Sequence, residues 1–462
     1  METFIIRALQ LILCLSLLIV LHEGGHFFFA KLFKVRVEKF CLFFDPWFTP
    51  FKWKPKHSDT TYAIGWLPLG GYVKIAGMID ESMDTQQMKQ PAQPWEFRSH
   101  PAWQRLFIMI GGVLVNFLVA LFIYSMILFH WGDTYIPMSQ MKMGMKFNTQ
   151  AKALGFEDGD ILLRTDTKAF KSFDSNTNIS DTYRDISTAR YVVVNRKGRE
   201  VKVNIPDGGL NMLEMFRAET PFVLPYLPSR IDTVLGDGAA AKAAIKAGDR
   251  IVAFNGTPLE TWGEYNSLIS RMHKRLKGAP TDDSLQARHV TVAICHAATG
   301  KTDTLHMMLD NNLMMGVGQS SLLTYYKPVT QHYGFFSSFP AGINHGVQVL
   351  KGYVGDLKYI FTKEGAQSIG SFGAIGSMFP AYWSWYRFWE LTAFISIILA
   401  FMNILPIPAL DGGHVLFLII EMVTRRKPSD KVMERAELIG ISLLLLLMVW
   451  AIRNDIVNFL IK

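Results

Sequence analysis

The sequence Leu-His-Glu-Gly-Gly-His occupies residues 21–26 and lies inside an apolar run from Phe4 to Phe29. In a helix, His22 and His26 are one turn apart on the same face, so both imidazoles can reach one metal ion, with Glu23 beside them. This is the HExxH pattern, in which zinc is the usual metal and the glutamate is the general base towards water that the metal activates. The alternative for so short a motif is an interfacial helix end whose polar groups are satisfied by their neighbours.

The position of the motif favours metal binding. Ionisable groups inside a membrane segment cost about 2.5–3.5 kcal/mol each on insertion scales, and less for neutral histidine, so they are rarely without function. Gly24 and Gly25 each cost roughly 1 kcal/mol in helix propensity, which is expected where a second backbone approaches closely. A catalytic zinc takes three protein ligands, so the rest of the sequence must supply one more.

Composition indicates a membrane protein with a substantial water-exposed part. Half of the 462 residues are hydrophobic, including 11 Trp and 33 Phe. The formal charge of +8 comes from Lys and Arg near the ends of apolar segments, so it indicates topology, and we expect no nucleic-acid partner. Cys14, Cys41 and Cys295 lie in separate regions, and we expect no intramolecular disulfide.

Four apolar stretches are expected to cross a lipid bilayer, the last with the help of flanking turns. Basic clusters follow the first stretch, precede the second and follow the third, which places those junctions in the cytoplasm by the positive-inside rule. The termini and the long region 131–387 are then outside, and HEGGH lies towards the cytoplasmic half. The first stretch lacks an Ala-x-Ala cleavage pattern and is expected to be retained. The stretches are residues 4–29, 106–129, 388–407 and 439–452.

The segment between the first two stretches predicts a β-hairpin. Residues 62–75 are rich in aromatic and β-branched residues and are interrupted by Gly70 and Gly71. We expect this hairpin to dip into the membrane part, where its edge can pair with an extended substrate strand. Gly70, Gly71 and Tyr72 are therefore candidate substrate-binding residues, and a surface hairpin packed on the helix ends is the alternative.

The outer region contains an internal repeat. Residues 153–163 align with residues 243–256, and Gly159-Asp160 matches Gly248-Asp249. A short helix that ends in glycine, followed by an apolar strand and a turn, fits a small β-rich module. The second copy resembles the circularly permuted bacterial PDZ domain, and the first copy does so more weakly. PDZ domains commonly capture peptide termini at a sheet edge, whereas the alternative is a spacer without a ligand.

A candidate third ligand follows the third apolar stretch, in Asn403-Ile-Leu-Pro-Ile-Pro-Ala-Leu-Asp411-Gly-Gly-His414. Asp411 is expected late in an outside-to-inside helix and therefore at the depth of HEGGH, which would complete a three-ligand site. Pro406 and Pro408 break the helix and free backbone groups, which are tolerated only beside protein or a water-filled cavity.

HEGGH paired with Asn-x-x-Pro-x-Pro-x-Leu-Asp-Gly resembles the site-2 protease family of intramembrane zinc metalloproteases. Four spans with tandem PDZ domains between the second and third resemble its bacterial regulator of sigma-E protease branch, and residues 68–75 are similar to the family's membrane-reentrant β element. The resemblance implies that Asn403 holds the substrate backbone or a developing oxyanion, and that His414 is not a ligand. It implies that Zn²⁺ is bound by His22, His26 and Asp411 and that Glu23 is the catalytic base.

The resemblance also implies a fold class, an activity and a location. The fold is a multi-span α-helical membrane protein with four transmembrane helices, a membrane-associated β-hairpin and two inserted β-rich PDZ domains. The activity is cleavage of transmembrane segments of single-span membrane proteins, such as anti-sigma factors and remnant signal peptides. The location is the bacterial inner membrane, with periplasmic PDZ domains and an active site towards the cytoplasm. The expected domains are 1–132 (first two helices and hairpin), 133–218 and 219–312 (PDZ), 313–385 (linker with an amphipathic surface helix at 347–361) and 386–462 (last two helices).

Two stretches depart from the family pattern. Phe43-Phe44-Asp45 stands where relatives have Gly-Phe-Gly, and Gly112-Val113 replaces Gly-Pro. Gly112 and Asn116, one turn apart, predict close helix packing and an amide that faces another helix, and Asn116 is also a candidate substrate-binding residue. A membrane-anchored PDZ adaptor or chaperone with a structural or vestigial zinc site is the alternative function. A metal transporter is less favoured, because no chain of ionisable residues crosses the membrane.

Overall fold

The computed structural model describes residues 2–68, 70–78, 90–173, 178–218, 220–276, 285–362, 365–366 and 369–457. The chain divides into two compact units. Unit 1 comprises Met1–Gly132 and His332–Lys462, and unit 2 comprises Asp133–Gln331. Leu69, which belongs to the expected hairpin, lies outside the described residues.

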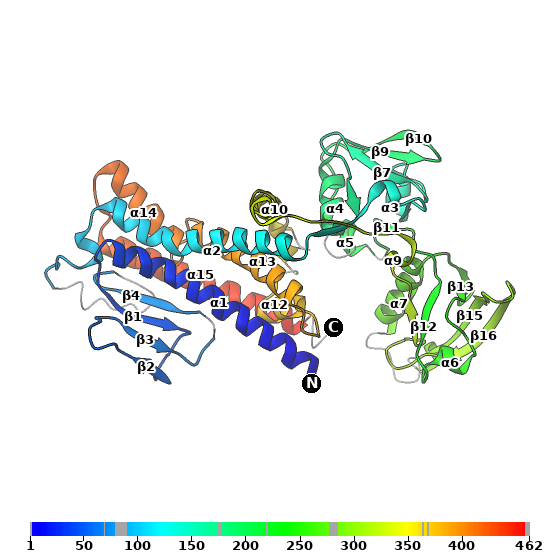
Figure 1. Ribbon diagram of the computed structural model, residues 1–462, viewed down its shortest axis with the longest axis horizontal. Helices are drawn as coiled ribbons and strands as arrows, with labels where there is room; N and C mark the ends of the chain where they lie inside the picture. Colours follow the sequence, from blue (N-terminus) through cyan, green and yellow to red (C-terminus); the bar gives the residue numbers. More distant parts are fainter. Residues whose placement is uncertain are drawn as a thin grey trace. The chain divides into compact units, whose positions relative to one another are not determined.

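Unit 1 contains four helices that are long and apolar enough to cross a membrane, counted over the described residues (Figure 1). They confirm the four expected spans, although the last helix begins earlier than expected, because the charged residues after Ser429 are already helical. These helices are α1 (Glu2–Leu32), α2 (Ala102–His130), α13 (Trp385–Ile404) and α15 (Asp430–Ile456).

Helices α1 and α2 meet at a pair of glycines. A Cβ atom on Gly25 would lie 2.3 Å from the carbonyl oxygen of Gly111, and one on Gly111 would lie 2.7 Å from the carbonyl oxygen of Gly25. Only glycine allows two helix backbones to approach this closely, so the expected role of the motif glycines is confirmed for Gly25. Apart from its neighbours in the chain and the backbone of its own helix, no described atom lies within 4 Å of the Gly24 Cβ position, and nothing in the structure explains this glycine.

A separate helix, α14 (Asp411–Thr424), follows the third span and was not predicted from the sequence. Helix α13 ends at Ile404, and residues 405–410 form a non-helical turn before α14 begins. Pro406 and Pro408 lack a backbone N–H and disfavour helical conformation in the residues before them. The expectation that Asp411 lies late in the third span is therefore wrong, since Asp411 is in the first turn of α14.

The segment after α1 forms a four-stranded sheet in the order β2-β3-β1-β4. Strand β1 pairs in parallel with β3 and antiparallel with β4, so the predicted hairpin over 62–75 is wrong. The segment between β3 and β4 crosses the end of β1 instead of turning back, and a Cβ atom on Gly71 would lie 2.8 Å from the carbonyl oxygen of Cys41 in β1. The strands, which are blue in Figure 1, are β1 (Val37–Leu42), β2 (Phe51–Trp53), β3 (Thr61–Ile64) and β4 (Tyr72–Ile75).

Helix α10 (Phe335–Asp356) packs on α2, at Gly342 and Gly346. A Cβ atom on Gly342 would lie 2.5 Å from the backbone N and Cα atoms of Ser125, so the two backbones are in close contact. The helix begins earlier than the amphipathic helix expected at 347–361, and it belongs to the helical core of unit 1 rather than to a linker. The described part of unit 1 also contains the short helices η2 (Phe97–Ser99), η4 (Leu357–Phe361) and α12 (Phe372–Met378).

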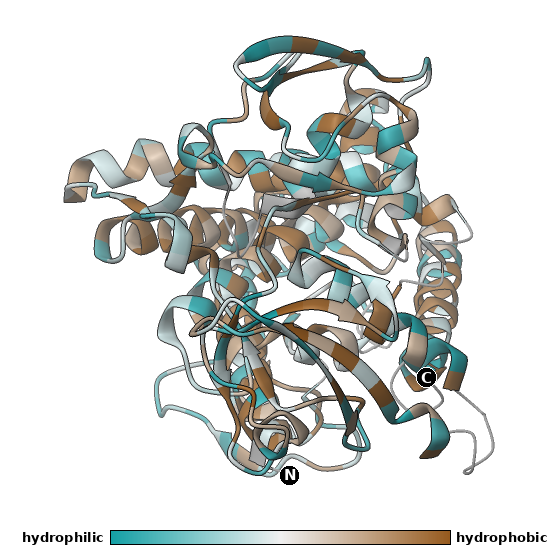
Figure 2. Cartoon of the chain, turned by 90° about the vertical axis from the view of Figure 1, so that its right-hand side faces the viewer, coloured by the Kyte–Doolittle hydropathy of each residue, from teal (hydrophilic) through white to brown (hydrophobic). Residues whose placement is uncertain are grey.

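Unit 2 consists of short helices and small sheets, and both hydrophobic and hydrophilic residues occur along its strands (Figure 2). Its sheets include one of four strands in the order β14-β13-β15-β16 and two of three strands in the orders β10-β9-β7 and β18-β5-β8. Its elements are β5 (Asp133–Pro137), η3 (Met138–Gln140), β6 (Met145–Phe147), α3 (Thr149–Ala153), β7 (Ile161–Thr165), β8 (Ser172–Phe173), α4 (Asn178–Thr188), β9 (Tyr191–Arg196), β10 (Arg199–Asn204), α5 (Met212–Arg217), β11 (Val223–Pro225), β12 (Ile231–Val234), α6 (Ala239–Lys242), β13 (Arg250–Phe254), β14 (Thr257–Pro258), α7 (Trp262–Leu276), β15 (His289–Cys295), β16 (Thr302–Met308), β17 (Val317–Gln319), α9 (Leu322–Tyr325) and β18 (Val329–Gln331).

The two copies of the sequence repeat share a local geometry. Asp160 accepts the N–H of Glu157 at 2.9 Å, and Asp249 accepts the N–H of Lys246 at 3.0 Å. The glycine before each aspartate donates its N–H at 2.8 Å to the first residue of β6 or β12. The PDZ assignment and its boundaries remain predictions, and the pairing of β11 with β6 favours a boundary after Pro225 rather than at residue 218.

Candidate metal centre

His22 and His26 of α1 converge with Asp411 of α14. The Nε2 atoms of His22 and His26 lie 3.2 and 3.4 Å from Asp411 Oδ2, and they lie 3.3 Å from each other. A tetrahedral zinc with ligands about 2.0–2.1 Å away has ligand atoms about 3.3–3.4 Å apart. The three atoms therefore already have the mutual spacing that zinc requires.

The Asp411 carboxylate also has the bonding state expected of a metal ligand. Its Oδ2 atom is buried and accepts no hydrogen bond from any described residue. A buried anionic oxygen without a donor is costly unless a cation compensates it. Gly412 and Gly413 explain how the carboxylate is placed, since Cβ atoms there would lie 2.0 Å from the Leu405 oxygen and 2.7 Å from the Ile407 oxygen. The chain before α14 therefore folds tightly over its first turn.

Helix α2 orients both imidazoles. His26 Nδ1 lies 2.8 Å from the carbonyl oxygen of Ile108, to which it donates, so its Nε2 lone pair remains available for a metal. His22 Nδ1 lies 3.2 Å from the Asn116 amide, whose Oδ1 has no partner among the described residues. If the amide rotates by half a turn, Oδ1 accepts the Nδ1–H of His22 and leaves Nε2 of that ring available as well.

Because Gly112 has no side chain, the imidazoles of His22 and His26 can lie against α2. A Cβ atom on Gly112 would lie 2.4 Å from His26 Nε2 and 2.6 Å from His22 Cε1. Simple helix packing, the interpretation that the sequence favoured for this glycine, therefore describes only part of its role. Its neighbour one turn on, Asn116, is 1% exposed and lies behind His22.

A cavity lies beside the three ligand atoms, and most of the predicted site residues line it. Asn403 Nδ2 is 3.3 Å from His22 Nε2, at the edge of the metal site. Glu23 lies beside the backbone amide of Val73 in β4. Gly70 and Asn116, both predicted to bind substrate, are not among the lining residues, and Gly70 packs on the Phe44 ring. The predicted residues that do line the cavity are His22, Glu23, His26, Gly71, Tyr72, Asn403 and Asp411.

Phe44 and Asp45, which belong to a stretch that departs from the family pattern, support Tyr72 at the edge of the cavity. Tyr72 donates a hydrogen bond of 2.8 Å to Asp45 Oδ1, and its ring stacks on Phe44. Thr49 and Lys39 donate to the other oxygen of Asp45. Burial alone would raise the pKa of Asp45, but these donors outweigh it and lower that pKa. Phe44 and Asp45 therefore hold Tyr72 in place.

Sequence reasoning missed Glu437, which reaches the same cavity from α15. Its side chain is 7% exposed, and its Oε2 atom is 3.8 Å from His414 Nε2. No local signal distinguishes Glu437 from the exposed Glu434, because both stand in the charged start of α15. His414 also lines the cavity but stays outside the group of three ligand atoms, in line with its expected non-ligand role.

The model of peptidase family M50 matches residues 10–447. The chain belongs to peptidase family M50. As an M50 peptidase it is a zinc metallopeptidase of the site-2 protease type, so the resemblance expected from the two motifs is confirmed.

Full-length relatives agree with this M50 assignment. The regulator of sigma-E protease RseP of Escherichia coli strain K12 is 28% identical over 476 residues, which cover 98% of this chain and 99% of that protein. Metalloprotease MmpA of Caulobacter vibrioides is 26% identical over 471 residues, covering 98% of this chain and 96% of that protein. A Vibrio cholerae protein named as a zinc metalloprotease is 28% identical over 477 residues, covering 96% and 97%. The chain is thus similar along its whole length to proteins named as metalloproteases and as a regulator of sigma-E protease.

Proposed function

We propose that this M50 peptidase hydrolyses a peptide bond within the transmembrane segment of single-span membrane proteins, at a zinc ion held by His22, His26 and Asp411. The observation that carries the proposal is the triangle of ligand atoms, with sides of 3.2 to 3.4 Å, beside a cavity that also contains Glu23 and Asn403. The full-length similarity to RseP supports a membrane-embedded protein substrate.

Several residues of the chain have separate roles in the proposed hydrolysis. Zinc in this site would lower the pKa of water towards ~7 and polarise the scissile carbonyl. Glu23 accepts the proton of the attacking water and passes it to the leaving amine. The Asn403 amide, next to His22 Nε2, donates a hydrogen bond to the developing oxyanion. Ile108 and Asn116 keep the two imidazoles in their ligand orientation.

The substrate must present an unwound segment, because an intact transmembrane helix uses its carbonyls in its own hydrogen bonds. Strand β4 is an edge strand of the four-stranded sheet and lines the cavity through Tyr72, Val73 and Ile75. We propose that β4 receives the unwound segment as an added strand. Gly71, at the start of this edge, also lines the cavity.

The proposal also covers the class of substrate and the orientation of the protein in the membrane. Anti-sigma factors that another protease has already trimmed, and remnant signal peptides, are single-span proteins of the required kind. The basic clusters at the helix ends support an inner-membrane orientation with the zinc site towards the cytoplasm. Unit 2 would then be periplasmic, and as a pair of PDZ domains it would capture peptide termini and exclude substrates with bulky outer domains.

Glu23→Gln tests the proposal. The purified full-length variant is expected to retain zinc but to cleave a tagged single-span substrate about 10²–10⁴-fold more slowly, as is typical when a general base is removed. Asp411→Ala, as a control, is expected to lose zinc. Undiminished cleavage by zinc-replete Glu23→Gln would contradict the mechanism. An adaptor with a structural zinc site instead predicts no cleavage by either the wild type or the variant.

A further inference from the structure

Helix α15 touches the turn before Asp411 at two points that are one helical turn apart. Glu437 Oε2 accepts the backbone N–H of Ala409 at 3.2 Å. A Cβ atom on Gly440 would lie 2.0 Å from the carbonyl oxygen of Pro408, so the α15 backbone rests directly on this turn. One contact is a hydrogen bond and the other is steric, and both act on adjacent residues of the turn.

The turn needs such support. Ala409 has φ +74°, a left-handed conformation that is disfavoured for residues other than glycine. Its N–H lies in a part-buried region, where a backbone donor without a partner is costly. Ala409 stands only two residues before the ligand Asp411, so a change in this turn would displace the carboxylate.

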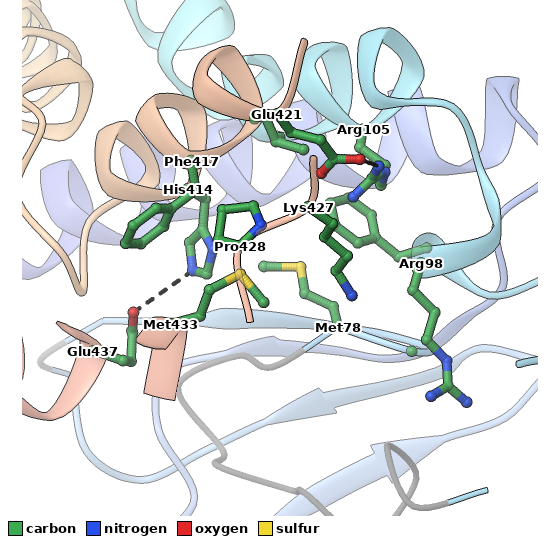
Figure 3. Close-up of a pocket in the computed structure, with 13 residues that line it drawn as sticks. Met78, Arg98, Arg105, His414, Phe417, Glu421, Lys427, Pro428, Met433 and Glu437 are labelled. Atoms are coloured by element: carbon green, nitrogen blue, oxygen red, sulfur yellow. Dashed lines mark hydrogen bonds and ion pairs between the residues drawn. The ribbon is translucent and has the colours of Figure 1, made fainter. Parts of the chain in front are cut away.

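Glu437 lies close to one residue that precedes Asp411 in the sequence, Ala409, and to one that follows it, His414. The Oε2 atom that accepts from Ala409 lies 3.8 Å from His414 Nε2, and the two side chains point towards each other (Figure 3). Both residues stand on the wall shared by the zinc-site cavity and a second cavity, whose other side carries the ion pair between Arg105 and Glu421. Glu437 therefore contacts the chain on both sides of Asp411 but is not itself one of the three ligand residues.

We propose that Glu437 is a positioning residue for the third zinc ligand, and that α15 sets the metal affinity by holding the Pro408–Ala409 turn. The inference rests on the proposed function, since it assumes that Asp411 binds zinc. A carboxamide can accept the same N–H, so glutamine should replace Glu437, whereas alanine or leucine should not. Outer residues that orient metal ligands typically change metal affinity about 10–100-fold when they are removed.

Zinc affinity of the full-length protein in detergent, measured by competition with a chromophoric chelator, tests the proposal. We expect Glu437→Ala to bind zinc about 10–100-fold more weakly than the wild type, and Glu437→Gln to stay within about threefold of it. Glu434→Ala is the matched control, because Glu434 is an exposed residue of the same type one turn away on α15, and it should be unchanged. Wild-type affinity in Glu437→Ala overturns the proposal.

Two further measurements separate positioning from loss of folding. Excess zinc should reload Glu437→Ala, and the reloaded variant should show a lower kcat with little change in KM, which an unfolded protein cannot do. Gly440→Ala, whose new methyl group would push on Pro408, should weaken zinc binding in the same direction, and wild-type affinity there also counts against the proposal. If wild-type protein binds zinc but cleaves no membrane substrate, the proposed protease function fails, whereas the effect of Glu437 on zinc affinity can still be measured.

Discussion

Gly112 of α2 lies so close to His26 of α1 that a Cβ atom on the glycine would come within 2.4 Å of the imidazole Nε2 atom. The same atom would lie 2.6 Å from His22 Cε1. A methyl group at this position therefore displaces both imidazoles from the spacing that a tetrahedral metal needs.

Gly112→Ala is expected to weaken zinc binding at least about tenfold, the lower end of what disturbed ligand support usually costs. Chelator competition with the purified full-length chain measures the change. Gly24→Ala is the control, because no described residue outside the same stretch of α1 lies within 4 Å of that Cβ position, and its zinc affinity should equal that of the wild type. Equal affinities in the two variants would show that Gly112 does not shape the site.

Asn116→Leu is expected to weaken zinc binding by about tenfold, because leucine has a similar size but cannot accept the Nδ1–H of His22. Asn116→Asp retains an acceptor and should bind zinc more tightly than the leucine variant. The same chelator competition measures both affinities. If both variants bind zinc equally, the amide does not orient His22.

Asn403→Ala is expected to reduce kcat by about 10²–10³-fold, as the loss of one oxyanion donor does in other hydrolases. Zinc content should stay the same, because Asn403 lies beside the ligand atoms and is not one of them. Steady-state kinetics with a tagged membrane substrate, together with metal analysis, checks both statements. A variant that raises only KM would assign Asn403 to substrate binding instead.

The local stability of unit 2 should fall in acid around Asp249. Burial alone would raise the pKa of this carboxyl, but the N–H groups of Ala297 and Lys246 and the His296 imidazole outweigh it, so the pKa is lowered. Because the folded pKa lies below the unfolded value of about 3.9, the stabilisation is present above that value. It is lost as the pH falls through the folded pKa.

Hydrogen exchange of the full-length chain between about pH 5 and pH 2, corrected for intrinsic exchange, should therefore show protection of the Lys246 and Ala297 amides that decreases below about pH 4. Asp249→Asn is the control and should flatten this pH dependence, because an amide does not titrate. Protection that decreases equally in the wild type and the variant would assign the effect to other groups.

Local patterns in the sequence were enough to find residues whose roles depend on spacing along one element. His22 and His26 lie together because a helix brings residues four apart to one face, and Glu23 is three residues before His26, a spacing that a helix also brings close together. Asp411 was also found, but its helix was not, because the two prolines indicate a break without indicating where the chain becomes helical again.

Contacts between distant segments explain what the sequence did not reveal. The strands flanking Gly70 and Gly71 were recognised by composition, but composition carries no information on strand order, so β1 was not expected between them. Glu437 was missed for a similar reason, since the turn that it supports lies in another part of the chain and α15 begins with several charged residues.

Strand β1 begins at Val37, shortly after α1 ends at Leu32, and it is the strand with which β4 pairs. A short link and one ladder of backbone hydrogen bonds therefore join the HEGGH helix to the strand at the cavity edge. The N-terminal segment up to Met78 thus carries two of the proposed metal ligands, the proposed general base and the proposed edge for substrate. A designer who grafts this segment onto another helical scaffold would need to supply a carboxylate on a supported turn and acceptors for the Nδ1–H groups of the two imidazoles.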